Sequence, residues 1–109
     1  MMIENVEYVR AIDGDTIVVN IPGLPNIFGK NISIRLAGIQ CPELRAKSES
    51  VRGFALRAKQ FTARKCQDSR NLVLANIKRG KYFRLVADVF YDGNHINSEL
   101  VSKGLAFQV

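Results

Sequence analysis

Three β-rich segments joined by turn residues fill the first third of the chain and limit its possible folds. Residues 5–12, "NVEYVRAI", and 16–21, "TIVVNI", are separated by "DGD" at 13–15. Asp-Gly tolerates positive φ, so these segments predict a β-hairpin. Residues 22–31, "PGLPNIFGKN", contain two prolines and two glycines and are expected to form a loop.

The third segment, residues 32–37, "ISIRLA", alternates between apolar and polar positions. Ile32, Ile34 and Leu36 share one face of the expected strand. Arg35 lies on the other face, between two apolar neighbours. Such a cation must reach solvent, an acid or an anionic ligand, because an unpaired buried charge is costly. A salt bridge and an anion site are both open interpretations.

The second half adds two helices and two strands. Residues 53–67 have an apolar stripe through Phe54, Ala58 and Phe61, which predicts a helix with these aromatic rings in the core. The other expected elements are an exposed loop at 38–52, strands at 71–77 and 83–91, a basic turn at 78–81, and a helix at 97–104 with Asn97 as its N-cap. The order β-β-β-α-β-β-α is that of a mainly β, α+β fold, a five-stranded OB-type barrel with two helices.

Composition is consistent with one domain over residues 1–109. The formal net charge of +6 favours a polyanionic partner such as nucleic acid, although solubility alone is an alternative explanation. Cys41 and Cys66 form no CxxC pair, so a zinc site is not indicated. No secretory signal or apolar span is evident, and we expect no membrane partner and a cytoplasmic protein, or a secreted one whose export signal was removed.

Polar residues follow the expected hairpin turn and the third strand. If these turns lie at one end of the barrel, then Asp13, Asp15, Gln40 and Glu43 converge there. Clustered oxygen ligands of this kind suit Ca²⁺ or Mg²⁺. Taken alone, "DGD" is better explained as a structural turn, because Asp-Gly turns are common. Arg84 raises the same question as Arg35, since guanidinium groups bind phosphate oxygens in a bidentate fork.

Five stretches resemble the staphylococcal nuclease (thermonuclease) family in its order and spacing, over roughly residues 6–106. They are "VRAIDGDTIVV", "IRLAGIQCPE", "GFALRAKQF", "GKYFRLVADVFYDG" and "INSELVSKGLA". The resemblance implies an OB-fold, Ca²⁺-dependent phosphodiesterase that acts on DNA and RNA and leaves 3′-phosphate ends. The expected partners are DNA or RNA, and the expected oligomeric state is a monomer.

The resemblance assigns a role to each matching position. Glu43 would be the general base or orient the attacking water, Arg35 would bind the phosphate, and Arg84 would stabilise the pentacoordinate phosphorus and the leaving oxygen. Asp15 would be a calcium ligand, with the backbone carbonyl of Cys41 and the outer-shell Asp13. Tyr82 and Lys81 match positions that contact a nucleotide phosphate.

Three departures from the family pattern bear on activity. Gln40 stands where the family has a ligating aspartate, which removes one negative charge and predicts weaker calcium binding. Phe83 stands where many members have glycine. The sequence ends at Val109, so the third C-terminal helix of the family is expected to be absent.

These departures leave two alternatives to an active nuclease. One is a catalytically weak or inactive module that binds nucleic acid or protein. The other is a small interaction domain whose basic charge serves solubility. Salt-sensitive binding without turnover would indicate the first alternative, and no binding would indicate the second.

Overall fold

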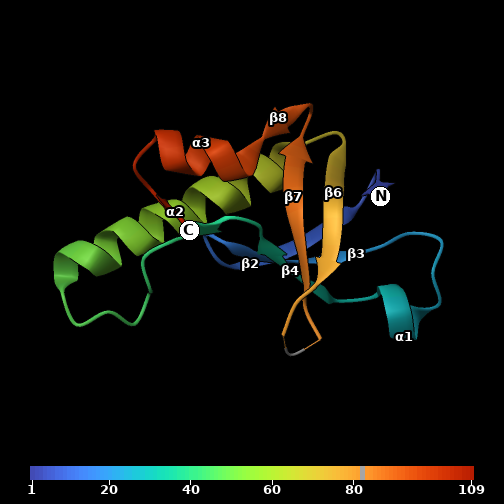
Figure 1. The fold of residues 1–109 in the computed structure, drawn as a ribbon, viewed down its shortest axis with the longest axis horizontal. Coiled ribbons are helices and arrows are strands. Elements are labelled where there is room, and N and C mark those ends of the chain that lie inside the picture. The colour runs from blue at the N-terminus through green and yellow to red at the C-terminus, as the bar shows by residue number, and fades with distance from the viewer. Residues whose placement is uncertain (82) are drawn as a thin grey trace.

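The computed structural model describes residues 1–81 and 83–109 (Figure 1). The helices are α1 (Asn26–Gly29), α2 (Glu49–Asp68) and α3 (Ile96–Ser102). The strands are β1 (Met2–Ile3), β2 (Glu7–Asp13), β3 (Thr16–Asn20), β4 (Ile32–Leu36), β5 (Ile39–Gln40), β6 (Leu72–Arg79), β7 (Leu85–Tyr91), β8 (Asn94–His95) and β9 (Phe107–Gln108).

Most strands form one sheet in the order β1-β6-β7-β4-β3-β2, with β8 paired to β7. The β2–β3 and β6–β7 pairs are antiparallel hairpins, whereas β4 and β7 run parallel. Within the described residues the outer strands β1 and β2 do not pair, so the sheet is open rather than a closed barrel. A separate two-stranded sheet joins β5 to β9.

The predicted class is confirmed, and the five expected strands (β2, β3, β4, β6 and β7) and two longer helices follow in the predicted order. The described residues add α1 and the short strands β1, β5, β8 and β9 to that order. The expected loop at 22–31 contains the short helix α1, closed by hydrogen bonds from Gly29 N to Pro25 O and from Lys30 N to Asn26 O. The described part of the chain therefore contains three helices rather than two. Helix α2 begins at Glu49, inside the expected loop at 38–52, because the Ser48 side chain accepts a hydrogen bond from Val51 N as its N-cap.

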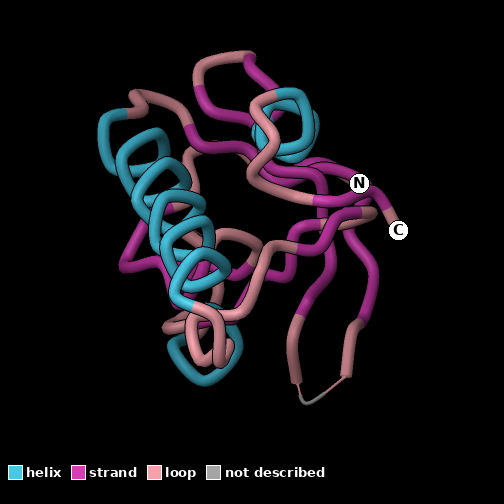
Figure 2. Tube along the Cα trace, turned by 90° about the vertical axis from the view of Figure 1, so that its left-hand side faces the viewer, coloured by secondary structure: helices cyan, strands magenta, loops and turns pink. Residues whose placement is uncertain are grey.

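The core lies between the sheet and the two longer helices (Figures 1 and 2). Its fully buried side chains come from alternate positions of the strands and one face of each helix, as the apolar periodicity predicts. They include Ile17, Val19, Ile34, Leu36, Leu74, Val89, Ile96 and Leu100. No helix among the described residues is long and apolar enough to cross a membrane.

The prediction that Phe54 is a core residue is wrong. Its side chain is 43% exposed, and the guanidinium of Arg57 lies 4.4 Å from its ring centroid. The reason is the length of α2, whose first half extends past the sheet in Figure 1. Phe61, about two helical turns further along α2, packs partly buried against the core as expected.

The prediction that Asn97 is an N-cap is also wrong, because His95 occupies that position. The Asn97 side chain is buried instead. Its Oδ1 accepts from Val89 N at 3.0 Å, and its Nδ2 donates to Ala37 O at 2.9 Å. A buried amide that is fully bonded ties α3 to β7 and to the end of β4.

A polar cluster at the start of α3 reinforces this attachment. His95 Nε2 lies 3.0 Å from Asp88 Oδ1, and Asn76 Nδ2 donates to Asp88 Oδ2 at 2.7 Å. Partial burial acts to raise the pKa of Asp88, but the hydrogen bonds from Asn76 and His95 outweigh it and lower that pKa below its ordinary value. The Asp88 carboxylate is therefore stabilised in its charged form.

The β2–β3 turn packs directly on α2 at Gly14. A Cβ atom at Gly14 would lie 2.7 Å from both the Ala58 Cβ and the Cys41 Sγ, which is too close for any side chain. Thr62 Oγ1 donates a buried hydrogen bond of 2.7 Å to the Gly14 carbonyl. The turn is therefore fixed against the helix by close packing and by one hydrogen bond.

Replacement of Gly14 by alanine is expected to lower the free energy of unfolding by about 1–3 kcal/mol, because the added methyl overpacks a closed contact. Gly53→Ala is the matched control, since no atom lies within 4 Å of its Cβ position on α2. Alanine there is expected to raise stability by about 0.5–1 kcal/mol. Urea unfolding measures both; equal midpoints for the two variants would contradict this packing.

Candidate functional site

The carboxyl groups of Asp13 and Asp15 lie together in the β2–β3 turn. Asp13 Oδ1 accepts a hydrogen bond from Asp15 N at 3.1 Å, which closes the turn around Gly14. Asp15 is buried, with a residue exposure of 7%. Its Oδ1 accepts from Thr16 Oγ1 at 3.3 Å, and its Oδ2 accepts from Cys41 N at 2.8 Å.

The pKa of Asp13 is raised to about 6, mainly by burial and then by hydrogen bonding to the neighbouring Asp15 carboxylate and repulsion from its like charge. The Asp15 backbone amide and the Thr16 hydroxyl act in the opposite direction. The turn thus concentrates negative charge that a cation would relieve.

Arg35 supplies one such cation from β4, where it pairs with Thr16 of β3 in the sheet register. Its Nη1 lies 3.4 Å from Asp15 Oδ2, and its side chain is 22% exposed. Nη1 also donates to the carbonyls of Asp15 at 3.3 Å and Leu36 at 3.0 Å, and Nη2 donates to the Ile39 carbonyl at 2.7 Å. The salt-bridge interpretation of Arg35 is thus confirmed in this structure, and its partner belongs to the predicted site.

The segment after β4 returns to the same turn through Cys41. Its backbone N donates to Asp15, and its thiol is buried with a pKa raised to about 12, mainly by burial and then by Asp15 and Asp13. Gln40 is exposed and belongs to β5, which pairs it with Phe107. The structure therefore brings Asp13, Asp15, Arg35 and Cys41 together, with Gln40 as the adjacent residue.

Glu43 and Arg84 are less closely engaged. Glu43 is exposed on the segment between β5 and α2, where its backbone carbonyl accepts from Ala46 N at 3.2 Å. Arg84 precedes β7, and its Nε donates to the Lys81 carbonyl at 3.4 Å. Among the described residues, Glu43 forms no ion pair with Arg35, and Arg84 forms none with Asp15.

Sheet register nevertheless relates Arg84 to Arg35. Ile34 pairs with Leu85 in the parallel β4–β7 ladder. Arg84 lies one residue before Leu85. Because Arg35 pairs with Val86, Arg84 is two residues before the partner of Arg35. Because side chains alternate along strands, Arg84 and Arg35 belong to the same face of the ladder.

The remaining predicted positions lie at the β6–β7 turn. Lys81 is exposed, and its carbonyl accepts from Arg84 N at 3.2 Å. The predicted phosphate contact of Tyr82 falls outside the described residues. Phe83 has a φ of 59°, in the left-handed region that bulky side chains rarely adopt, and its side chain is fully exposed.

The donor set of the turn suits a hard divalent cation of modest affinity. The turn supplies the carboxylates of Asp13 and Asp15, and the neighbouring segment carries the other two predicted ligands, the Cys41 carbonyl and the Gln40 side-chain carbonyl. No group of three or more His, Cys, Asp or Glu residues that could hold a metal occurs in residues 1–81 and 83–109. The chemistry of the site therefore fits Ca²⁺ or Mg²⁺ with fewer charges than a tight site has.

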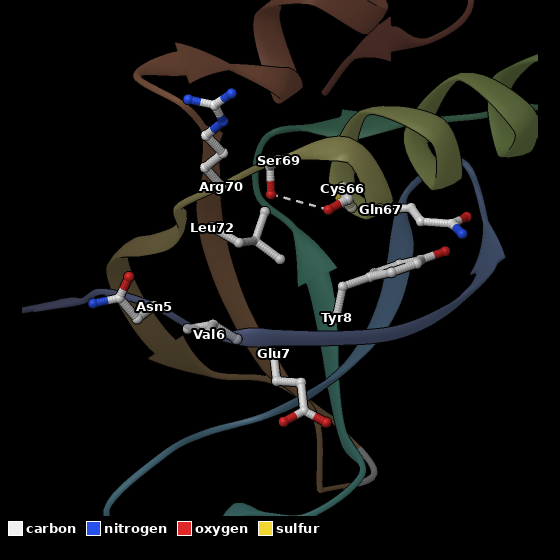
Figure 3. A pocket seen from close by; sticks show the side chains of 9 residues that line it. All are labelled: Asn5, Val6, Glu7, Tyr8, Cys66, Gln67, Ser69, Arg70 and Leu72. Atoms are coloured by element: carbon white, nitrogen blue, oxygen red, sulfur yellow. Dashed lines mark hydrogen bonds between the residues drawn. The ribbon is translucent and has the colours of Figure 1, made fainter.

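A pocket elsewhere offers a poorer alternative. Figure 3 shows this cavity of about 290 Å³, between the start of β2 and the end of α2. Its charged lining residues are Glu7 and Arg70, and none of the predicted site residues lines it. The lining also includes Cys66 and Ser69, but burial raises the pKa of the Cys66 thiol to about 12, and the Ser69 hydroxyl donates to the Cys66 carbonyl at 2.9 Å. No base therefore activates either group, and the pocket offers a weaker candidate site.

The sequence patterns did not identify Thr62, whose side chain on α2 holds the β2–β3 turn in place. A hydroxyl on the apolar stripe of the helix was the available signal, because a buried hydroxyl needs a partner. That partner is the Gly14 carbonyl, which lies 48 residues earlier and which no local pattern identifies.

Comparison with known proteins adds an independent finding. A profile of the family described as "Staphylococcal nuclease homologue" matches residues 33–109. The chain is 29% identical over 99 residues to the thermonuclease of Staphylococcus hyicus, covering 90% of this chain and 55% of that protein.

Two further relatives carry the name endonuclease. An uncharacterized endonuclease of Haemophilus influenzae is 33% identical over 99 residues, which cover 91% of this chain and 49% of that protein. A probable endonuclease of Schizosaccharomyces japonicus is 37% identical over 84 residues, which cover 71% of this chain and 36% of that protein. The chain thus spans about half or less of the length of these relatives.

Replacement of Arg35 by lysine is expected to lower the free energy of unfolding by about 1–3 kcal/mol, because one ammonium cannot serve the acceptors that the guanidinium fork serves. Arg10→Lys, at an exposed position of β2, is the control and is expected to change it by less than about 0.5 kcal/mol. Denaturant unfolding compares the two. A stable Arg35→Lys variant would mean that the carbonyl contacts contribute little.

Proposed function

The chain belongs to the staphylococcal nuclease homologue family, and on this basis we propose that it is a phosphodiesterase that hydrolyses DNA or RNA with little sequence preference. The observation that carries the proposal is the contact between the Asp15 carboxylate and the Arg35 guanidinium at the edge of an oxygen-rich turn. An anion-binding cation beside a cation-binding carboxylate is what a phosphodiester and its metal require.

The metal that we propose is Ca²⁺, held by Asp15, Gln40 and the Cys41 carbonyl, with Asp13 in the outer shell. When bound, such an ion lowers the energy of the negative charge that develops on the phosphate oxygens. Gln40 contributes a neutral oxygen, so the binding is expected to be weak.

The protein residues would divide the reaction among them. Arg35 binds a non-bridging phosphate oxygen. Glu43 accepts a proton from a water molecule, whose oxygen forms a new bond to phosphorus. The bond from phosphorus to the 5′ oxygen would then break, with Arg84 stabilising the charge on that oxygen until it takes a proton from solvent. The products would carry a 3′-phosphate and a 5′-hydroxyl. Lys81 and Tyr82 are the proposed contacts to a neighbouring phosphate.

A second candidate is a nucleic-acid-binding module with weak or no turnover. Arg35 already donates to three backbone carbonyls, and Glu43 has no ion-pair partner among the described residues. Salt-sensitive binding in the absence of cleavage would favour this candidate.

Replacement of Glu43 by glutamine is expected to reduce calcium-dependent cleavage of a single-stranded DNA by at least about a hundredfold, because the general base is lost. Glu4→Gln, at another exposed acid, is the control and should cleave as the unaltered protein does. Gel analysis with calcium and with EDTA measures both. Cleavage that is insensitive to calcium, or equal in both variants, would contradict the proposal.

Replacement of Gln40 by aspartate restores a charged ligand and is expected to tighten calcium binding about tenfold. Gln67→Asp adds the same charge at an exposed position of α2 and should leave the affinity nearly unchanged. Isothermal titration calorimetry gives both dissociation constants. If the two variants tighten binding equally, Gln40 is not a ligand.

A further inference from the structure

A groove of about 790 Å³ lies between α1 and the β6–β7 hairpin, beyond the turns that carry the proposed metal ligands. Its volume is within the range of about 300–1,000 Å³ that is typical of ligand sites. It is lined by Ile27, Phe28, Ile32, Arg79, Gly80, Phe83, Arg84 and Leu85. In Figure 1, α1 lies at the right and the β6–β7 hairpin extends downward near the centre.

The groove exposes unusually large apolar side chains. The exposed fraction of the residue is 67% for Phe28, 82% for Ile27 and 103% for Phe83, relative to a fully exposed residue. A cluster of exposed apolar side chains of this kind is typical of a surface that binds a partner or a ligand. The φ of Phe83 lies in the left-handed region and strains the backbone. Its ring is exposed to solvent, so packing within the protein does not offset this strain.

Two backbone hydrogen bonds of Arg84 close the hairpin that carries Phe83. Gly80 N donates to Arg84 O at 2.8 Å, and Arg84 N donates to Lys81 O at 3.2 Å. A Cβ at Gly80 would lie 2.9 Å from Val86 Cγ2, so glycine is required there. These contacts fix the backbone on which Phe83 projects.

The charges of the groove select its occupant. Arg79 and Arg84 line it, and no acid does. The ion pairs among the described residues involve neither arginine. Cations next to exposed aromatic rings are the combination that binds single-stranded nucleic acid, because the cations contact phosphates while the rings stack on bases.

We propose that this groove binds a base of a single-stranded DNA or RNA chain against Phe28 and Phe83, with the adjoining phosphates on Arg79 and Arg84. The inference rests on the proposed nucleic-acid substrate, and Arg84 connects the groove to the proposed reaction. A duplex keeps its bases stacked on one another, so the groove discriminates in favour of single strands.

The test measures binding with EDTA present, which separates it from cleavage. Fluorescence anisotropy compares a labelled oligothymidylate with an abasic strand of the same length for the unaltered protein, for the Phe28→Ala/Phe83→Ala double variant and for Phe54→Ala. Phe54 is the matched control, because it is an exposed aromatic residue on α2, outside the groove. Circular dichroism checks that each variant is folded.

The double variant is expected to bind oligothymidylate about tenfold more weakly and the abasic strand unchanged, because only the former offers bases to stack. Phe54→Ala should match the unaltered protein on both strands. An equal loss on both strands, or no loss, would overturn the proposal. A change in sedimentation of the double variant with unchanged oligothymidylate binding would also overturn it, by indicating a surface for a second protein chain.

The failure of the groove can be distinguished from the failure of the proposed hydrolysis. A base-dependent loss of binding, in a protein that does not cleave with calcium, supports the groove and removes the nuclease proposal. Calcium-dependent cleavage that Glu43→Gln abolishes, together with base-independent binding, retains the nuclease and overturns the groove.

Discussion

The contact between the Arg35 guanidinium and the Asp15 carboxylate determines how this site is built. A carboxylate whose side chain is only 9% exposed needs partners, and Asp15 receives them from Arg35 and from the backbone amide of Cys41. The same guanidinium bonds the Ile39 carbonyl at 2.7 Å. Arg35 therefore connects the β2–β3 turn to the segment after β4. This connection places the predicted metal ligands Asp15, Gln40 and Cys41 in neighbouring segments.

The residues of the proposed reaction lie in two settings: the carboxylates are held in a packed turn, and Glu43 and Arg84 lie on surface segments. The turn at Gly14 rests on α2 through Ala58 and Thr62, which fixes the carboxylates that would bind a cation. Glu43 and Arg84 belong instead to segments at the surface, without an ion-pair partner among the described residues. Substrate phosphate is the group that would relate these two settings, since it can accept from guanidinium groups in both.

Local sequence patterns predicted what depends on neighbours in the chain, namely the hairpins, the alternation of β4 and the core stripe of α2 from Ala58 onward. They did not predict contacts made across the sequence, such as the pairing of Gln40 with Phe107 or the buried amide of Asn97. For the candidate site, the residue types pointed to the β2–β3 turn and to the segment after β4, and the structure brings Asp15 and Cys41 of these segments together with Arg35. The partner of Arg35 remained open, because salt bridges and phosphate sites require the same residue, and only the strand register brings Asp15 beside it.

A crystal structure with Ca²⁺ and a nucleoside bisphosphate tests the central claim most directly. The account predicts an ion bound to a carboxylate oxygen of Asp15 and to the Gln40 side-chain oxygen, with the Arg35 guanidinium on a phosphate oxygen of the nucleotide. An ion bound away from Asp15, or a nucleotide bound elsewhere while Arg35 keeps its contacts to the turn carbonyls, would contradict it.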